Sequence, residues 1–151
     1  MITAFHLEVT NAESILSKVN AFYESCGKVT SVSPHDILIV ARDGIDIVGV
    51  ARLSKEEAAY VLRTMQIRED LQGQGLGTLI LNRFDKLLTE LKISRVYCMP
   101  YLHLEYFYGL IGFRKIAAKD APVFLQNRAK DFHLRNPGKD VILMRLQRAK
   151  I

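Results

Sequence analysis

The sequence predicts a mixed α/β fold of the α+β kind, in which helices flank a largely antiparallel central sheet. Residues 36–67 contain three apolar runs joined by two tight turns, which is the pattern of an antiparallel meander. A strand, an amphipathic helix and a second strand then follow between 58 and 99, which predicts a βαβ unit with a parallel strand pair. The chain has 151 residues, 49% hydrophobic and 25% charged, so we expect a single soluble domain over 1–151.

The first half of the chain predicts one strand, one helix and the meander. Residues 3–9 alternate loosely and predict the strand, and Asn11 is expected to cap a helix that ends at Gly27. The apolar face of this helix consists of Ile15, Leu16, Val19, Phe22 and Tyr23. The meander strands are expected at 36–42, 46–53 and 58–67, with turns at 43–44 and 54–57.

The second half predicts helices and strands in alternation. A helix over 76–91 carries apolar residues at spacings of three and four, which predicts a face packed on the sheet. The elements expected after it are a strand at 95–99, a short helix at 103–110, a strand at 113–117, a helix at 121–133 and a last strand at 140–146. No repeat or linker interrupts this order.

The stretch from Gln72 to Gly77 has three glycines that alternate with larger residues just before a helix. Exposed amides and the positive end of a helix favour a phosphate or pyrophosphate, although a flexible turn into the helix explains the glycines equally well. The glycines lie in mid-chain, and residues 68–71 separate them from the preceding strand. This position excludes a dinucleotide fold, and the absence of a Lys-Ser/Thr pair after the glycines excludes a P-loop, so we expect a cofactor other than NAD or ATP.

Two separate stretches resemble motifs of the GNAT superfamily of acetyl-CoA-dependent acyltransferases. Gln72, Gly75 and Gly77 fit the family's (Arg/Gln)-x-x-Gly-x-(Gly/Ala) motif, and residues 107–113, Phe-Tyr-Gly-Leu-Ile-Gly-Phe, fit its F-Y-x-x-x-G-F segment. A predicted helix and strand separate the two motifs, as in the family. The resemblance covers essentially the whole chain and implies a GNAT-like fold with acetyl-CoA as co-substrate.

The resemblance also implies which residues bind the cofactor. Backbone amides would hold the pyrophosphate of coenzyme A at Gln72, Gly73, Gln74, Gly75, Leu76, Gly77 and Thr78. The backbone of Met65 and Ile67 would pair with the pantetheine arm, and an amide near Met65 or Gln66 would stabilise the oxyanion. Tyr108 would face the sulfur and act as general acid towards the thiolate, or it packs a short helix onto the sheet.

The group that accepts the amine proton is less clear from the sequence. Many relatives carry Glu on the strand at 58–67, but Leu62-Arg63-Thr64 occupies its centre here. The candidate bases are Glu57, which is preferred to the adjacent Glu56, and His103, with Glu105 and His35 as further candidates. Each is also explained as a surface residue, and a chain of water molecules serves the same purpose. Arg63 would bind a carboxylate of the acceptor if it points into the cleft, or it faces solvent or pairs with a nearby acid.

Two further departures from the family pattern concern the acceptor. Tyr101 occupies a position where many relatives carry Asn, although Leu102-His103 resembles the version found in others. One N-terminal helix is predicted where relatives often have two. The acceptor is therefore the least determined part of the function.

The leading hypothesis is an N-acetyltransferase that transfers acetyl from acetyl-CoA to a primary amine by direct attack in a ternary complex. A small-molecule or amino-acid-like acceptor is expected, and a protein N-terminus or lysine is the next alternative. A non-catalytic acyl-CoA sensor on the same fold is an alternative of a different class. Nucleic-acid modification is a third, suggested only by the basic C-terminal region.

Charge and composition set the expected partners and location. Residues 114–150 carry ten Lys or Arg against three Asp, but these are scattered among apolar residues, so we expect a solvated face and no nucleic acid. No apolar run approaches the ~18 residues that span a bilayer, and no secretory signal is apparent. Cys26 and Cys98 fit no metal spacing, so we expect no metal and a reducing cytoplasm. An apolar strand over 141–144 would allow a homodimer.

Overall fold

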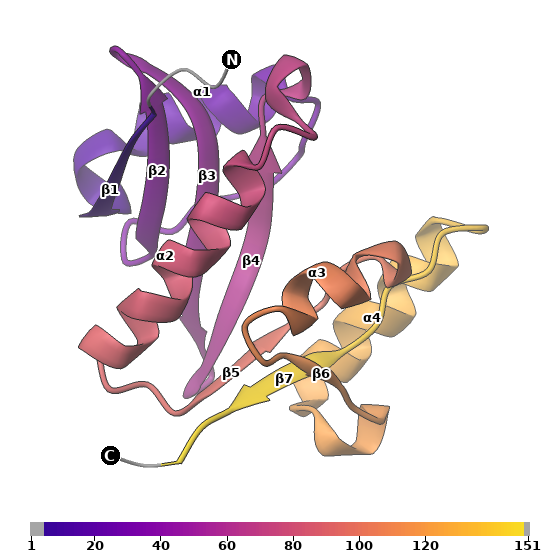
Figure 1. The fold of residues 1–151 in the computed structure, drawn as a ribbon. Helices are drawn as coiled ribbons and strands as arrows, with labels where there is room; N and C mark the ends of the chain where they lie inside the picture. Colours follow the sequence, from indigo (N-terminus) through magenta and orange to yellow (C-terminus); the bar gives the residue numbers. More distant parts are fainter. Residues whose placement is uncertain (1–4, 150–151) are drawn as a thin grey trace. The chain divides into compact units, whose positions relative to one another are not determined.

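The computed structural model describes residues 5–149, and the element order confirms the predicted fold class (Figure 1). Seven strands form a sheet in the order β1-β2-β3-β4-β5-β7-β6. The strands are β1 (His6–Asn11), β2 (Ile37–Asp43), β3 (Asp46–Glu56), β4 (Ala59–Ile67), β5 (Arg95–Cys98), β6 (Arg114–Lys115) and β7 (Met144–Gln147). The helices are α1 (Leu16–Ser25), α2 (Leu76–Glu90), α3 (Glu105–Gly109) and α4 (Val123–Arg135), with short 3₁₀ turns η1 (Ala12–Ile15), η2 (Glu69–Leu71), η3 (Leu102–Leu104) and η4 (Ala118–Asp120).

Two compact units make up the chain. The first consists of the residues up to 55 together with 62–87, and the second consists of 56–61 and the residues from 88 onward. β4 and α2 therefore each contribute residues to both units. The single domain expected over 1–151 stays a prediction.

In the first unit, β2 and β3 pair antiparallel, which confirms the first hairpin of the predicted meander. β1 also pairs antiparallel with β2, which the sequence did not predict. On one face, Val19, Phe22 and Tyr23 of α1 pack with buried residues of β2 and β3 that include Leu38, Val40 and Val50. On the other face α2 approaches so closely that a Cβ on Gly49 would lie 2.9 Å from Cδ1 of Ile80. Because alternate strand residues point to opposite faces, Gly49 and Val50 place α1 and α2 on opposite sides of this sheet (Figure 1).

The second unit is built on β5, β7 and β6, which pair antiparallel. One apolar cluster consists of Val61, Tyr97, Ala121, Leu125 and Leu143, so α4 covers the face that Tyr97 presents. Tyr97 lies beside Arg145 across the β5–β7 pair, and Arg114 lies opposite Arg145 across the β6–β7 pair.

The last strand differs from the prediction, because β7 begins at Met144 instead of residue 140. Val141 forms only an isolated bridge with Tyr101, and the amide of Ile142 donates to the carbonyl of Pro100 at 2.9 Å. Met144 has strand neighbours on both sides, Cys98 and Lys115. At Met144 this strand therefore has no free edge with which a strand of a second copy could pair. A homodimer stays a prediction.

Two other local expectations were wrong. Asn11 makes no side-chain cap bond; instead the hydroxyl of Ser14 donates to the Asn11 carbonyl at 3.1 Å, and the first turn is 3₁₀. The second meander turn is not at 54–57, because β3 continues to Glu56. The turn lies at Glu57 and Ala58, both with positive φ (46° and 69°), as a tight two-residue hairpin requires.

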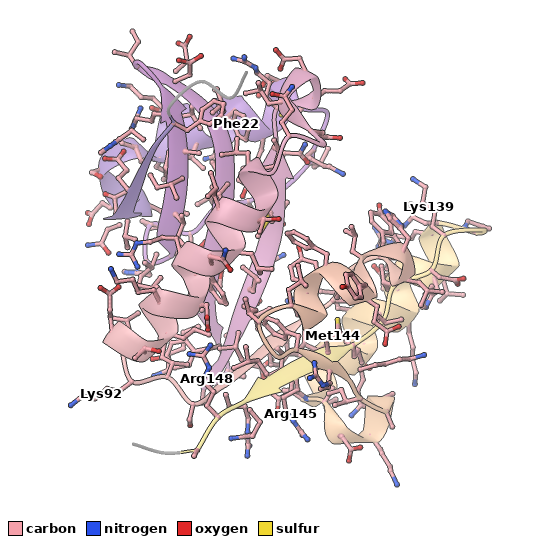
Figure 2. The ribbon with its side chains drawn as sticks, viewed as in Figure 1. Phe22, Lys92, Lys139, Met144, Arg145 and Arg148 are labelled. Atoms are coloured by element: carbon pink, nitrogen blue, oxygen red, sulfur yellow. The ribbon has the colours of Figure 1, made fainter. Side chains whose placement is uncertain are left out.

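Some basic residues of the C-terminal region lie together and others lie apart. Arg114 lies opposite Arg145 across the β6–β7 pair. Figure 2 shows Lys139, Arg145 and Arg148 at separate points of the second unit. Of the helices in residues 5–149, none combines the length and the hydropathy needed to cross a membrane.

Candidate functional site

The glycine-rich loop lies between η2 and α2, at the end of β4. Gly73 and Gly75 have φ of 78° and 87°, in the left-handed region that other residues adopt at a cost of about 1–2 kcal/mol. A Cβ at either position would meet no atom within 4 Å, so open space lies over this backbone. The residues from Gln72 to Gly75 are exposed. An open, side-chain-free backbone at the start of a helix fits a pyrophosphate.

Side chains of the loop fold back onto its own backbone. The Gln72 amide donates to the Ile67 carbonyl at 3.1 Å, and the Gln74 amide donates to the Asp70 carbonyl at 3.2 Å. Arg68 pairs with Asp70 at 2.6 Å, and its hydrogen bond lowers the pKa of that carboxyl. Since Asp70 neutralises Arg68, the backbone amides are the main donors that this loop offers to an anion.

The Ile67 carbonyl is occupied in a way that the sequence did not predict. The side chain of Gln66, which is buried, donates to it at 2.8 Å, and Gln72 donates to it as well. Pairing of pantetheine with this carbonyl would therefore require both glutamine side chains to rotate away. Met65 and Ile67 are half-buried at the same end of β4.

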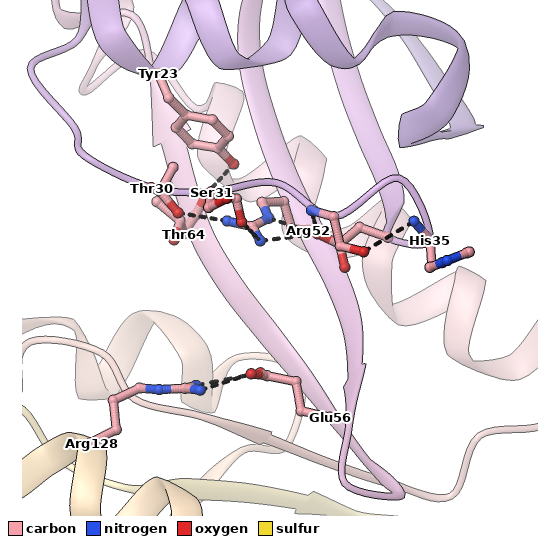
Figure 3. Close-up of polar contacts among 10 residues, drawn as sticks. Tyr23, Thr30, Ser31, His35, Arg52, Glu56, Thr64 and Arg128 are labelled. Carbon is pink, nitrogen blue, oxygen red and sulfur yellow. Dashed lines mark hydrogen bonds and ion pairs between the residues drawn. The ribbon is translucent and has the colours of Figure 1, made fainter.

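β4 is irregular at Thr64, which has φ of 35° in the middle of the strand. A left-handed residue inside a strand turns the following peptide out of the ladder, as in a β-bulge. The Tyr23 hydroxyl of α1 donates to the Thr64 carbonyl at 2.6 Å (Figure 3). The helical pattern placed Tyr23 on an apolar face, and no local signal indicates a partner 41 residues away.

A buried ion pair holds the segment that follows α1. Two nitrogens of the Arg52 guanidinium donate to the Asp36 carboxylate at 2.9 and 3.2 Å, and two bonds reach the Thr30 hydroxyl (2.7 Å) and the Ser31 carbonyl (2.9 Å) (Figure 3). Arg52 is 1% exposed. Residues 30–36 are thereby fixed to β3 without a second helix. Nothing in the sequence distinguished Arg52 from a surface arginine.

A hollow of about 1010 Å³ lies beside the glycine-rich loop, within the first unit. Ser25 and Cys26 line it at the end of α1, and Gln66, Arg68 and Gln72 line it from β4 and the loop. Its volume is at the upper end for sites that bind small molecules.

Tyr108 belongs to the second unit, on α3. It is 7% exposed, with its ring edge-on to Phe107 (5.0 Å between centroids) and Phe113 (6.1 Å). The hydroxyl makes no hydrogen bond to any residue that the structure describes. Burial, and secondarily the neighbouring Cys98, raises the pKa of Tyr108, so the phenol stays protonated at neutral pH. Burial also raises the pKa of Cys98, which disfavours a reactive thiolate there.

The candidate bases also lie in the second unit, and neither is buried. Glu57 is exposed in the β3–β4 turn, and His103 is exposed with its ring stacked on Tyr101 at 5.8 Å. Glu56 is engaged by Arg128 at 2.7 Å (Figure 3). Arg63, in the first unit, is half-buried in β4. In the part of the chain that the structure describes, no cluster of His, Cys, Asp or Glu is suited to a metal ion.

Residues 8–122 match the family described as Acetyltransferase (GNAT) domain. The chain belongs to the GNAT acetyltransferase family. The family match covers the glycine-rich loop, β4 and Tyr108. None of the curated proteins matches the sequence.

Solved structures agree with the GNAT assignment at the level of fold. ElaA from Escherichia coli has a TM-score of 0.67 at 14% identity, covering 95% of this chain and 100% of that one. The ribosomal-protein-alanine N-acetyltransferase from E. coli has a TM-score of 0.66 at 13% identity, covering 97% of this chain and 96% of that one. N-acetylglutamate synthase from Neisseria gonorrhoeae, complexed with coenzyme A and N-acetyl-glutamate, has a TM-score of 0.63 at 16% identity, covering 97% of this chain and 36% of that one.

Proposed function

We propose that this GNAT domain transfers an acetyl group from acetyl-CoA to a primary amine on a small or amino-acid-like acceptor, by direct attack in a ternary complex. The observation that carries the proposal is the open, glycine-rich backbone at the end of β4, in a chain of the GNAT family. The loop offers several amides to one anion and leaves room above them.

The cofactor residues follow from this arrangement. Amides of residues 72–78 hold the pyrophosphate, once the Gln72 N–H releases the Glu69 carbonyl to which it donates at 3.3 Å. Gly73 and Gly75 keep that backbone accessible. The backbone of Met65 and Ile67 pairs with the pantetheine arm after Gln66 and Gln72 release the Ile67 carbonyl. An amide at Met65 or Gln66 then lies near the thioester oxygen, where it stabilises the negative charge of the tetrahedral intermediate.

The chemistry requires one proton to leave and another to arrive. The neutral amine attacks the acetyl carbon, its proton passes to Glu57, His103 or water, and the C–S bond then breaks. Tyr108 hydrogen-bonds the departing thiolate. Because burial raises the pKa of Tyr108, full transfer of its proton is unfavourable, and the hydrogen bond is the larger part of its contribution.

The proposed acceptor class follows from one residue and from two structural relatives. Arg63 is half-buried on β4 and suits a carboxylate on the acceptor. One structural relative is an N-acetylglutamate synthase, in keeping with an amino-acid-like acceptor on this fold. Another relative acts on an alanine of a ribosomal protein, so a protein N-terminus is the second candidate acceptor.

The test is thiol release from acetyl-CoA in the presence of amino acids, other small primary amines and peptides with free N-termini. We expect release with at least one small acceptor. Binding of coenzyme A without release for any acceptor would favour the non-catalytic sensor instead. The pH–rate profiles of Glu57→Gln and His103→Gln then identify the base, and an unchanged profile in both variants assigns that role to water.

A further inference from the structure

The contact between Tyr23 and Thr64 controls one peptide group of β4. No peptide bond in the described chain is cis, so the peptide that joins Thr64 to Met65 is trans and planar. In such a peptide the carbonyl and the N–H point in opposite directions. A partner that holds the Thr64 oxygen therefore also sets the direction of the Met65 N–H.

The direction can be derived within the first unit. Tyr23 reaches Thr64 from α1, on the face of the sheet opposite α2. The Thr64 carbonyl is bonded towards α1, so the Met65 N–H points away from α1. The N–H is thereby aimed at the face of the sheet that α2 covers.

The hydroxyl, and not the ring, makes this contact specific. Tyr23 is 1% exposed, and a phenylalanine would fill the same space among Val19, Phe22 and Val50. A buried hydroxyl is costly unless it is hydrogen-bonded, and its 2.6 Å bond is at the short end for O–H···O contacts. A hydrogen bond to a carbonyl also polarises the N–H of the same peptide, which makes that N–H a stronger donor.

We propose that Tyr23 is a positioning residue for acetyl transfer, whose hydroxyl aims and polarises the Met65 N–H towards the thioester oxygen. The inference rests on the proposed function, since it assumes that acetyl-CoA lies along the end of β4. As the amine nitrogen bonds to the acetyl carbon, the C=O electron pair moves onto oxygen, and the Met65 N–H stabilises that charge. The amine nitrogen gives up one proton to Glu57, His103 or water, and the C=O bond re-forms. The thiolate then leaves with the C–S electron pair, and Tyr108 hydrogen-bonds it.

The test is Tyr23→Phe, with Tyr106→Phe as the matched control, because Tyr106 is 83% exposed on α3. We expect kcat of Tyr23→Phe to fall about tenfold, less than the ~100-fold loss of an entire oxyanion donor. The KM for acetyl-CoA and the Kd for coenzyme A should stay within about twofold, since coenzyme A has no acyl oxygen to sense the N–H. Tyr106→Phe should leave all three values unchanged.

A spectroscopic readout makes the test independent of turnover. The carbonyl stretch of bound ¹³C-labelled acetyl-CoA should move to higher frequency in Tyr23→Phe, because a weaker hydrogen bond polarises the carbonyl less. An unchanged stretch and an unchanged kcat would overturn the inference. A parallel loss of kcat, coenzyme A affinity and Tm would also overturn the inference, because it would mean that the Tyr23 hydroxyl only supports the packing of the fold. If the unmodified protein binds no acetyl-CoA, the proposed function fails; if it binds and only the Tyr23 effects are missing, the inference alone fails.

Discussion

Arg52 donates two hydrogen bonds to the Asp36 carboxylate, and both side chains are buried, with 1% and 4% exposed. Thr30 and Ser31 occupy further donors of the guanidinium, and the Ser33 amide donates to the same Asp36 oxygen at 3.0 Å. The pair thus ties residues 30–36 to the middle of β3.

Breaking this pair should destabilise the fold strongly. Arg52→Met leaves the Asp36 charge buried without a countercharge, with only the Ser33 amide still donating to it, and we expect the free energy of unfolding to fall by about 3–5 kcal/mol. Chemical denaturation of the wild type and the variant measures this change in the free energy of unfolding. The control is Arg135→Met, which breaks the exposed pair with Asp131 (77% and 59% exposed) and should cost ~0.5 kcal/mol or less. Equal effects would mean that the buried network does not hold the segment.

Gly75→Ala should separate cofactor binding from backbone strain. Gly75 has φ of 87°, so alanine there should cost about 1 kcal/mol or more of stability and place a methyl group over the loop. We expect the Kd for coenzyme A, measured by calorimetry, to rise at least about tenfold, since a Cβ holds the phosphate off the amides.

Gly138→Ala is the matched control for that measurement. Gly138 has φ of 86° and equally open surroundings, but it lies in the loop before β7. It should lose similar stability with no change in coenzyme A affinity. A similar loss of affinity in both variants would remove the loop as the pyrophosphate site.

Tyr108→Phe should lower kcat by about 10- to 100-fold, at or below the low end for general acid catalysis, because we assign it mainly a hydrogen bond to the thiolate. The KM for acetyl-CoA should change little. Since burial raises the pKa of Tyr108, the wild-type rate should show no alkaline limb from this residue below about pH 10. Turnover at the wild-type rate in the variant would contradict the assignment.

The same pKa shift makes a prediction about stability. The pKa of Tyr108 is higher in the folded protein than its unfolded value of about 10, so the folded state resists ionisation. Its contribution to stability is complete below pH 10 and is lost as the pH rises through the folded pKa. Between pH 9 and 11, the stability of Tyr108→Phe should therefore fall less steeply than that of the wild type. Parallel slopes, measured by denaturation at each pH, would show that Tyr108 is not shielded from water.

The order of the elements was readable from the sequence, because strand and helix periods and tight turns are local properties. The helix from Leu76 is one example, and the β2–β3 turn is another, since it lies at Gly44 and Ile45, one residue from the predicted position. The start of the last strand was misplaced because no residue type in the apolar run at 141–146 indicates where hydrogen bonding to the neighbouring strands begins. The β3–β4 turn was misplaced for a similar reason, since Glu57 and Ala58 adopt positive φ without Gly or Asn.

The sequence by itself determined the family and the glycine-rich loop, since both depend on residue types at fixed short spacings. Only the tertiary structure decided that Asp70 neutralises Arg68 and that Glu56 is engaged by Arg128. It also decided that the Tyr108 side chain is largely buried, and that Tyr23 holds the Thr64 carbonyl. The physical reason is that a hydrogen bond or a pKa depends on distances and on water exclusion. Those quantities are set when residues far apart in the chain pack together, as Tyr23 and Thr64 do.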